Sequence, residues 1–190
     1  MRVFSLSLIF FLFSCHLSAQ NSDNNLPLRF LFEGALEFGG EPVAEVLFTN
    51  GDTQSVNAGQ GGSIRVGGEL TVPKLEKLRF RASAGIKYVT TAADNVNIRL
   101  TRIPIHLTAN WMITDDIRLG LGFVTHQNIN FKADGIGDDI SFESANGPIF
   151  ELAWKGVGIN FTLMEYMDNT GETYSANAIG LTFSGVLPKR

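Results

Sequence analysis

Apolar and polar residues alternate with a period of two between residues 99 and 123. On one side of a tight polar turn at residues 114–116, odd positions carry the apolar residues Ile103, Ile105, Leu107, Ala109 and Trp111. On the other side, the apolar odd positions are Ile117, Leu119, Leu121 and Phe123. Strict alternation on both sides of a turn predicts a β-hairpin with one apolar and one polar face.

The same alternation recurs along the chain and predicts eight strands, at residues 29–38, 62–72, 78–89, 98–111, 117–125, 148–155, 157–163 and 174–187. The links after the second, fourth and sixth strands are tight, and the other links are longer. Arms of about ten residues match a tilted strand that crosses a hydrocarbon layer. An even strand number with short turns at one end favours an all-β fold, an eight-stranded antiparallel up-and-down transmembrane β-barrel with short periplasmic turns and longer outer loops.

One predicted strand does not keep its alternation. Ile98 and Leu100 are apolar at even positions, whereas the apolar positions from Ile103 onward are odd. A β-bulge near Thr101 and Arg102, which adds one residue, would place all of them on one face.

The longer links differ from one another. Residues 43–49 and 53–56 flank an Asn-Gly-Asp turn within residues 39–61 and predict a hairpin that protrudes beyond the membrane. Residues 90–97 and 168–173 are expected to be polar loops, and residues 126–147 a long acidic segment.

The first nineteen residues differ in kind from the rest. Arg2 precedes an apolar run at residues 3–13 that is too short to span a membrane as a helix, and Ala19 ends a small-residue cleavage site. We therefore expect a signal peptide at residues 1–19, a polar lead-in at residues 20–27 and the barrel domain at residues 28–190. Cys15 also lies in an imperfect lipoprotein box, so lipidation there is the alternative to cleavage after Ala19.

The composition of the chain argues against several classes of function. The net charge of −4 provides no basic surface for nucleic acid. Cys15 is the only cysteine, so the exported chain has no disulfide. Asp134, Asp138 and Asp139 surround glycines, but their spacing matches no calcium loop, and no metal or cofactor is expected.

The polar face of each strand predicts the contents of the barrel. Eight strands enclose little more than side chains, and buried charges require partners, so we expect ion pairs to plug the lumen. The alternative is a narrow conduit that favours anions. The predicted lumen residues are Arg29, Glu33, Glu37, Arg65, Glu69, Arg79, Arg81, Lys87, Arg99, Arg102, His106, Arg118, His126, Glu151 and Lys155.

Three stretches carry a resemblance to a known family: residues 38–40 (Phe-Gly-Gly), residues 48–51 with 58–61, and residues 101–105 (Thr-Arg-Ile-Pro-Ile). On these, residues 28–187 resemble the small eight-stranded outer-membrane β-barrel proteins of the OmpA, OmpX and OmpW kind. The resemblance implies export to the outer membrane and a monomer folded by the barrel-assembly machinery. It also implies contact with outer-membrane lipid and lipopolysaccharide, and a structural, surface-interaction or narrow-pore role.

Two other functions can be compared with this one. Lipid A deacylases are barrels with a His-x-Ser-Asn motif, and His126 is followed by Gln127 and Asn128, which leaves no nucleophile unless Ser141 or Ser144 folds back. We therefore expect no enzyme. A secreted, soluble lipocalin-like barrel that binds a small apolar ligand would require the apolar face to point inward.

Overall fold

The structure is a computed structural model that describes residues 28–47, 53–93, 96–135 and 137–188. The described residues form β-strands and no helix, and none of them belongs to a helix long and apolar enough to cross a membrane. The predicted signal peptide and lead-in lie outside the described residues. The strands are β1 (Leu28–Phe38), β2 (Pro42–Leu47), β3 (Thr53–Asn57), β4 (Gly61–Val72), β5 (Leu75–Ala93), β6 (Val96–Met112), β7 (Ile117–Lys132), β8 (Ile140–Phe142), β9 (Ala145–Trp154), β10 (Val157–Thr162), β11 (Glu165–Met167), β12 (Thr173–Ser175) and β13 (Ala178–Leu187).

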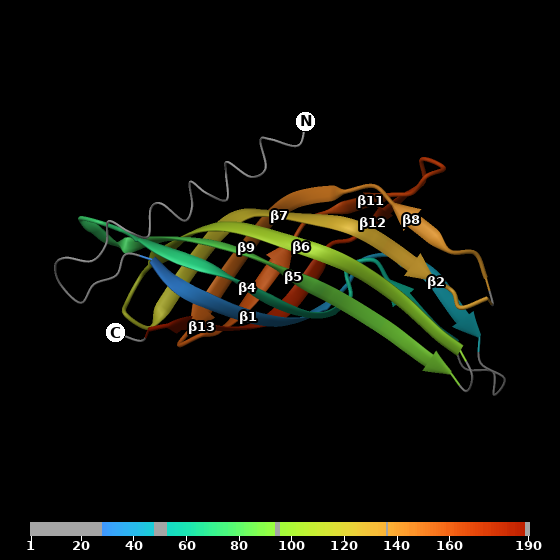
Figure 1. Cartoon of the computed structure of the whole chain (residues 1–190), viewed down its shortest axis with the longest axis horizontal. Coiled ribbons are helices and arrows are strands. Elements are labelled where there is room, and N and C mark those ends of the chain that lie inside the picture. The colour runs from blue at the N-terminus through green and yellow to red at the C-terminus, as the bar shows by residue number, and fades with distance from the viewer. Residues whose placement is uncertain (1–27, 48–52, 94–95, 136, 189–190) are drawn as a thin grey trace, which may run out of the picture.

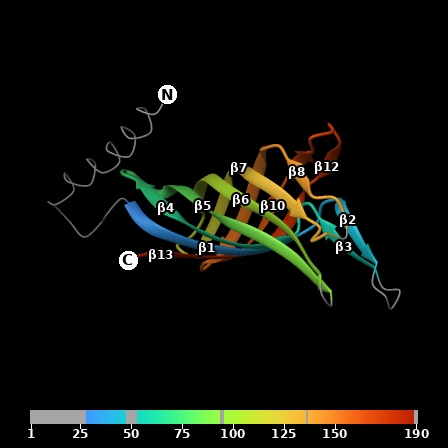
Figure 2. The ribbon, with the colours of Figure 1, turned by 45° about the vertical axis from the view of Figure 1, so that its right-hand side comes forward.

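Eight of the described strands close into an antiparallel barrel. Their order around the wall is β6-β5-β4-β1-β13-β10-β9-β7, and the pairing of β6 with β7 completes the ring. β8 continues the line of β9 along β7, while β2 with β3 and β11 with β12 form separate two-stranded sheets. The closed eight-stranded antiparallel barrel predicted from the sequence is confirmed, and its tilted strands are visible in Figures 1 and 2.

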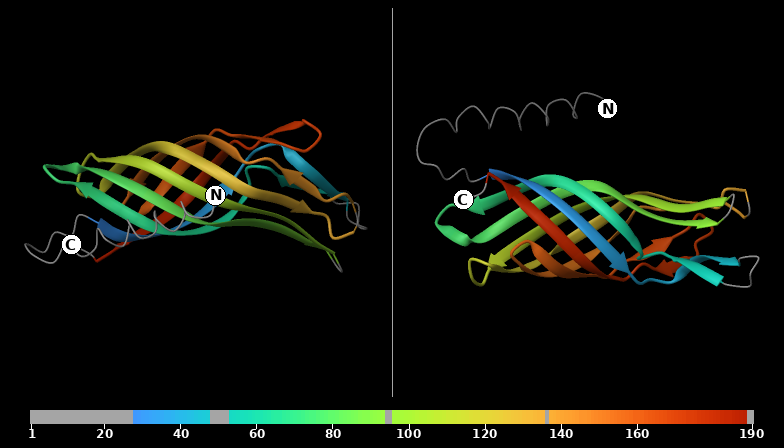
Figure 3. Two further views of the ribbon diagram at one scale, coloured as in Figure 1. Left: turned by 45° about the horizontal axis from the view of Figure 1, so that its top comes forward. Right: turned by 90° about the horizontal axis from the view of Figure 1, so that it is seen from below.

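The two ends of the barrel differ. Turns of two to four residues join β4 to β5, β6 to β7 and β9 to β10 at the end where β1 begins and β13 finishes, on the left of Figure 1. We call it the short-turn end. Lys155 and Gly156 both have positive φ in the last of these turns, as a two-residue type I′ hairpin turn requires. At the other, long-strand end, β5 and β6 and the β2–β3 hairpin extend outward, as Figure 3 also shows.

A belt of apolar side chains surrounds the wall near the short-turn end. Large residues at alternate positions of all eight strands point outward and are exposed, with Phe30 71 % and Ile64 76 % exposed, while alternate residues such as Arg29 and Arg65 are buried inside. This is the polarity of a barrel that crosses a membrane. It contradicts the requirement of the lipocalin-like alternative, because in this belt the apolar face points outward.

The polarity reverses beyond the belt. Toward the long-strand end, the outward positions of the barrel strands become polar, as at Arg99, Gln127 and Asn146. The inward positions become apolar and form a buried cluster that we call the outer core, which consists of Val43, Val56, Ala58, Ile98, Leu100, Val124, Ile129, Phe131, Ala133, Phe142, Ala145, Ile149, Met164, Tyr166 and Ala176. The barrel therefore continues beyond the belt with the polarity of a soluble protein.

This reversal corrects the interpretation of the fourth predicted strand. Inward positions of β6 are even throughout, and Ile98 and Leu100 are buried in the outer core instead of facing lipid. The register of β6 with β7 does shift between Thr101 and Ile103, but the additional residue belongs to β7, next to Asn128, whose φ is +50°. The prediction was wrong about the strand because it assumed that every apolar residue faces lipid.

The strands are also longer than predicted at this end. Within residues 90–97, expected to be a loop, residues 90–93 belong to β5 and residues 96 and 97 to β6, and Thr90 pairs with Arg99. Most of residues 126–147 are likewise in β7, β8 and the start of β9. The strand pairing expected within residues 39–61 is confirmed as β2 with β3, and the predicted Asn-Gly-Asp turn lies outside the described residues.

Candidate functional site

The lumen within the apolar belt contains a network of ion pairs. Glu69 of β4, which is 0 % exposed, accepts from Arg29 of β1, and its Oε2 lies 2.7 Å from Nη2 of Arg81 of β5. Nη1 of Arg79 is 3.7 Å from the other carboxylate oxygen. Adjacent strands bring these groups together because antiparallel pairing sets Arg29 and Arg81 directly beside Glu69.

A second group surrounds Glu33 of β1. Arg65 Nε donates to Glu33 at 3.4 Å, Ser83 Oγ donates to the same oxygen at 2.5 Å, and Nη1 of Arg81 is 3.8 Å from the carboxylate. Arg81 therefore links the groups around Glu33 and Glu69. On the far wall, Arg118 of β7 donates to Glu151 of β9.

The third group lies closest to the outer core. Glu37 of β1 pairs with Lys87 of β5 at 2.8 Å and accepts from Asn160 Nδ2 of β10 at 3.0 Å. Polar side chains thus join opposite sides of the barrel across its axis. Sequence reasoning missed Asn160, although the alternation of strand seven placed it at an inward position.

The structure puts thirteen of the fifteen predicted lumen residues in the interior and two elsewhere. Arg99 is half-buried on the outward face of β6, because the strand keeps its register. Lys155 lies in the turn between β9 and β10, where its exposed ammonium group is 3.4 Å from Asp116. The interior residues are Arg29, Glu33, Glu37, Arg65, Glu69, Arg79, Arg81, Lys87, Arg102, His106, Arg118, His126 and Glu151.

A backbone turn lies inside the barrel, above the ion pairs. Residues 57–60, which we call the plug turn, fold inward between β3 and β4. Lys87 Nζ donates to the carbonyl of Gly59 at 2.7 Å, and Arg102 donates to the carbonyls of Ala58, at 2.7 Å, and Gln60. Two cations of the wall thus bind the backbone of the plug turn.

Glycine allows the plug turn to approach its neighbours. Gly40 has φ +83°, and a Cβ there would lie 2.4 Å from the nitrogen of Gly59. A Cβ on Gly59 would lie 2.5 Å from the carbonyl oxygen of Asn177. Both glycines belong to the stretches that carry the family resemblance in the sequence, and here their small size permits backbone contact across the lumen.

His126 lies at the border of the outer core. Its Nδ1 is 2.5 Å from the hydroxyl of Tyr166, a residue of β11 that is 0 % exposed. The guanidinium carbon of Arg102 is 6.0 Å from the Tyr166 ring centroid. The deacylase comparison would need Ser141 or Ser144 beside this histidine. Ser141 instead donates to Asn130 Oδ1 at 3.0 Å, and both serines are exposed.

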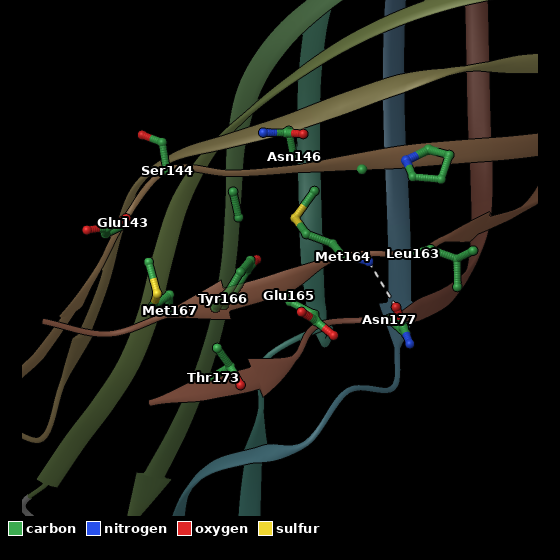
Figure 4. A pocket seen from close by; sticks show the side chains of 13 residues that line it. Glu143, Ser144, Asn146, Leu163, Met164, Glu165, Tyr166, Met167, Thr173 and Asn177 are labelled. Atoms are coloured by element: carbon green, nitrogen blue, oxygen red, sulfur yellow. Dashed lines mark hydrogen bonds between the residues drawn. The ribbon is translucent and has the colours of Figure 1, made fainter. Parts of the chain in front are cut away.

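Above the belt, in the part of the chain that the structure describes, the wall is interrupted between β9 and β11. Leu163 N donates to Pro148 O at 3.1 Å, and Glu143 N donates to Met167 O at 2.9 Å. Among the described residues, no backbone hydrogen bond between β9 and β11 lies between these two. The resulting opening, which we call the wall gap, is a pocket of about 630 Å3 (Figure 4).

The acidic segment that precedes β8 forms no cation site in the described residues. Asp139 accepts from the backbone of Ala133 at 2.9 Å and lies 3.5 Å from Lys132, and no group of three or more metal-ligating side chains occurs in the described part of the chain. The hydrogen bond from Ala133 lowers the pKa of Asp139 more than any other contact.

Comparisons with known proteins find similarity in fold only. No family model matches this sequence, and no curated protein matches it. Among solved structures, Ail of Yersinia pestis is 9 % identical with a TM-score of 0.43, and Neisserial surface protein A is 12 % identical with a TM-score of 0.44. Each match covers 83 % of this chain and 97 % of the other. The outer membrane channel DcaP of Acinetobacter baumannii is 13 % identical, with 72 % of this chain and 42 % of that chain covered and a TM-score of 0.37.

Proposed function

We propose that this chain is a non-conducting integral protein of the bacterial outer membrane that acts through its long-strand end at the cell surface. Closed barrels and helices are the structures that can satisfy their backbone groups in lipid, and the apolar belt supports the placement of that part of the barrel in lipid. Outer-membrane barrels have short turns on the periplasmic side and longer segments outside. This orientation places the outer core and the β2–β3 hairpin outside the cell.

The observation that carries this proposal is that three successive layers of side chains and backbone occupy the lumen. Ion pairs around Glu69, Glu33 and Glu37 link β1, β4 and β5, and Asn160 of β10 joins Glu37 from the other side of the barrel. The plug turn covers these groups with backbone that Lys87 and Arg102 bind. The outer core then fills the space beyond the plug turn. We infer that these three successive layers interrupt the water path along the described lumen, which supports a structural or surface-interaction role over transport.

The partners follow from the same placement. Outer-membrane lipid would surround the belt, and lipopolysaccharide would contact the polar rim above it. We propose a monomer, because a closed eight-stranded barrel leaves no open sheet edge within the membrane. Export through a signal peptide and insertion by the barrel-assembly machinery belong to the same proposal.

Planar-bilayer recording tests the closure of the lumen. The refolded protein should give a conductance indistinguishable from the bilayer alone. The variant Lys87→Ser with Arg102→Ser, which removes the donors to the plug turn, should give measurable current. Steady conductance of the unmodified protein would overturn the non-conducting proposal. Recovery in the outer-membrane fraction, with heat-modifiable gel mobility, tests the location separately.

A narrow anion conduit is the second candidate, and the charge of the lumen favours it. The interior positions carry seven cationic side chains but only four carboxylates, so cations exceed anions by three: Arg29, Arg65, Arg79, Arg81, Lys87, Arg102 and Arg118 against Glu33, Glu37, Glu69 and Glu151. A conduit would show a reversal potential that shifts with the chloride gradient. The absence of current at any chloride gradient would exclude it.

We also propose that the barrel is not a lipid A deacylase. Nδ1 of His126 is already hydrogen-bonded to the hydroxyl of Tyr166. The residue two positions after His126 is Asn128, which has no nucleophilic oxygen. Mass spectrometry of lipid A from cells that produce the protein should show the mass of control cells. Lipid A lacking one acyl chain would contradict this proposal.

A further inference from the structure

The wall gap exposes backbone N–H and C=O groups. Elsewhere in the wall, such groups are hydrogen-bonded between neighbouring strands. In an antiparallel strand, the N–H and C=O of alternate residues point to the same neighbour. Because Pro148 and Leu163 bond across the seam, the peptide groups two residues further on, those of Asn146 and Glu165, also point across it. Unpaired peptide groups take a partner from water or a ligand, so the gap presents hydrogen-bonding backbone on both of its sides.

The position of the gap along the barrel axis determines which groups surround it. Immediately below it, Leu163 and Phe150 belong to the apolar belt, with 39 % and 46 % of each exposed. At the level of the gap, the outward residues are Ser144, Asn146 and Glu165. Unpaired backbone does not occur facing hydrocarbon, so the gap lies at the level of the lipid head groups, with acyl chains directly below.

The gap does not lead into the lumen. Met164 and Tyr166 behind it are 3 % and 0 % exposed and belong to the outer core. Asn177 Oδ1 accepts from the backbone of Met164 at 2.9 Å, as the dashed line in Figure 4 shows, and fixes this inner wall. A molecule in the gap would therefore stay in the wall and could not pass through it.

The residues that line the gap favour a cationic ligand over an anionic one. Its apolar part includes Pro148, Leu163 and Met167, and its polar part includes the carboxylates of Glu143 and Glu165. No lysine or arginine is among the described residues that line it. An anionic head group would be repelled by the carboxylates, whereas an ammonium group can donate three hydrogen bonds to carbonyls and carboxylates.

We propose that the wall gap is a binding site for an amphiphile with one apolar chain and an ammonium head group. The head group lies in the gap between Asn146 and Glu165, and the chain extends down over Leu163 on the outside of the belt. This site is separate from the closed lumen and does not depend on whether the lumen conducts. It would give the protein a means to recognise one class of lipid at the outer surface.

Photolabelling of the full refolded chain in neutral maltoside micelles tests the site. The probe is a sixteen-carbon chain that carries a diazirine and an ammonium head, and a second probe carries a sulfate head on the same chain. Saturable labelling by the ammonium probe should concentrate in residues 143–148 and 163–167. The variant Glu143→Lys with Glu165→Lys should reduce this labelling about tenfold, and labelling by the sulfate probe should rise at the same residues.

A matched pair of substitutions keeps the test specific. Glu76→Lys with Asp115→Lys makes the same change of charge at exposed positions of the short-turn end and should leave both labelling patterns unchanged. Heat-modifiable mobility of every variant shows that the barrel has folded. Labelling spread evenly along the belt strands, or a preference between the probes that charge reversal at residues 143 and 165 does not alter, would overturn the proposal.

Discussion

The two halves of the lumen are filled by opposite kinds of side chain. Within the apolar belt, the interior is ionic, with Glu69 fully buried among arginines, and the exterior is apolar. Beyond the belt, the same strands hold an apolar interior around Leu100 and Phe131 beneath a polar exterior. The side-chain direction of β6 does not change between the two halves, so the solvent outside the wall determines the chemistry of both faces.

The two interiors should respond differently to the loss of one side chain. The stability of an ionic interior depends on the pairing of opposite charges, because removal of one partner leaves buried charges uncompensated. An apolar interior depends on volume, because removal of a side chain leaves a cavity. Four predictions, in order of decreasing effect, test this difference.

Glu69→Ala should be the most damaging single substitution. It leaves Arg29 and Arg81 buried without their carboxylate, which costs about 3–5 kcal/mol in the free energy of unfolding. Urea titration of the protein in lipid vesicles, followed by heat-modifiable mobility, measures the loss. Asp116→Ala breaks the exposed pair with Lys155 and should cost less than about 1 kcal/mol. Equal losses for the two variants would contradict the ionic account of the lumen.

Leu100→Ala should destabilise the outer core by about 2–5 kcal/mol, as buried leucines do in soluble proteins. The loss should be independent of ionic strength, because no charge is involved. Leu107→Ala, on the outward face of the same strand, is the control and should cost less, because its side chain is 59 % exposed on the belt. If Leu107→Ala proved the more costly of the two, Leu100 would not be a core residue.

The border between the halves can be located with one strand. Phe123→Arg on β7 places a charge in the belt and should cost about 2–4 kcal/mol. Gln127→Arg, four residues further along the same outward face, should cost no more than about 1 kcal/mol, because it lies at the membrane surface. Unfolding in vesicles compares the two. Similar costs would mean that the belt extends beyond its assigned border.

The smallest predicted effect is in the turn between β11 and β12. The hydroxyl of Thr170, followed by backbone donors of the turn, lowers the pKa of Asp168 below its ordinary value of 3.8. The ionised carboxylate therefore stabilises the turn above pH 3.8, and this contribution is lost as the pH falls through the lower pKa of the folded state. Hydrogen exchange of Thr170 and Glu172 amides should be slow at pH 6 and faster in Asp168→Asn at the same pH. Identical exchange rates in the two proteins would show that the Asp168 carboxylate does not stabilise this turn.

The membrane half of the fold could be predicted from the sequence. A period of two with one charged and one apolar face determines strand positions and register, and eight such segments with alternating loop lengths indicate a closed barrel. The prediction identified Arg29, Glu69 and Arg81 as lumen residues because charge on a membrane strand must point inward.

The outer half could not be predicted in the same way. An apolar residue at an inward position, such as Ile98, has the same sequence signal as a shifted register, and only the extent of the membrane separates the two interpretations. The plug turn depends on long-range contacts of the Ala58 and Gly59 carbonyls, which carry no side-chain pattern. The wall gap arises from pairing that stops at Pro148 and Leu163, and a strand pattern alone does not show which neighbours fail to pair.

The most direct test of the polarity reversal is a spin-label scan along β6. Single cysteines at Leu107, Thr101 and Leu100, each in a Cys15→Ser background, are labelled after refolding into vesicles, and collisions with oxygen and with a water-soluble nickel complex are measured. The account predicts oxygen access at 107, nickel access at 101, and access to neither reagent at 100. Oxygen access at position 100, as in lipid, would mean that β6 shifts its register after all and that the apolar outer core does not exist.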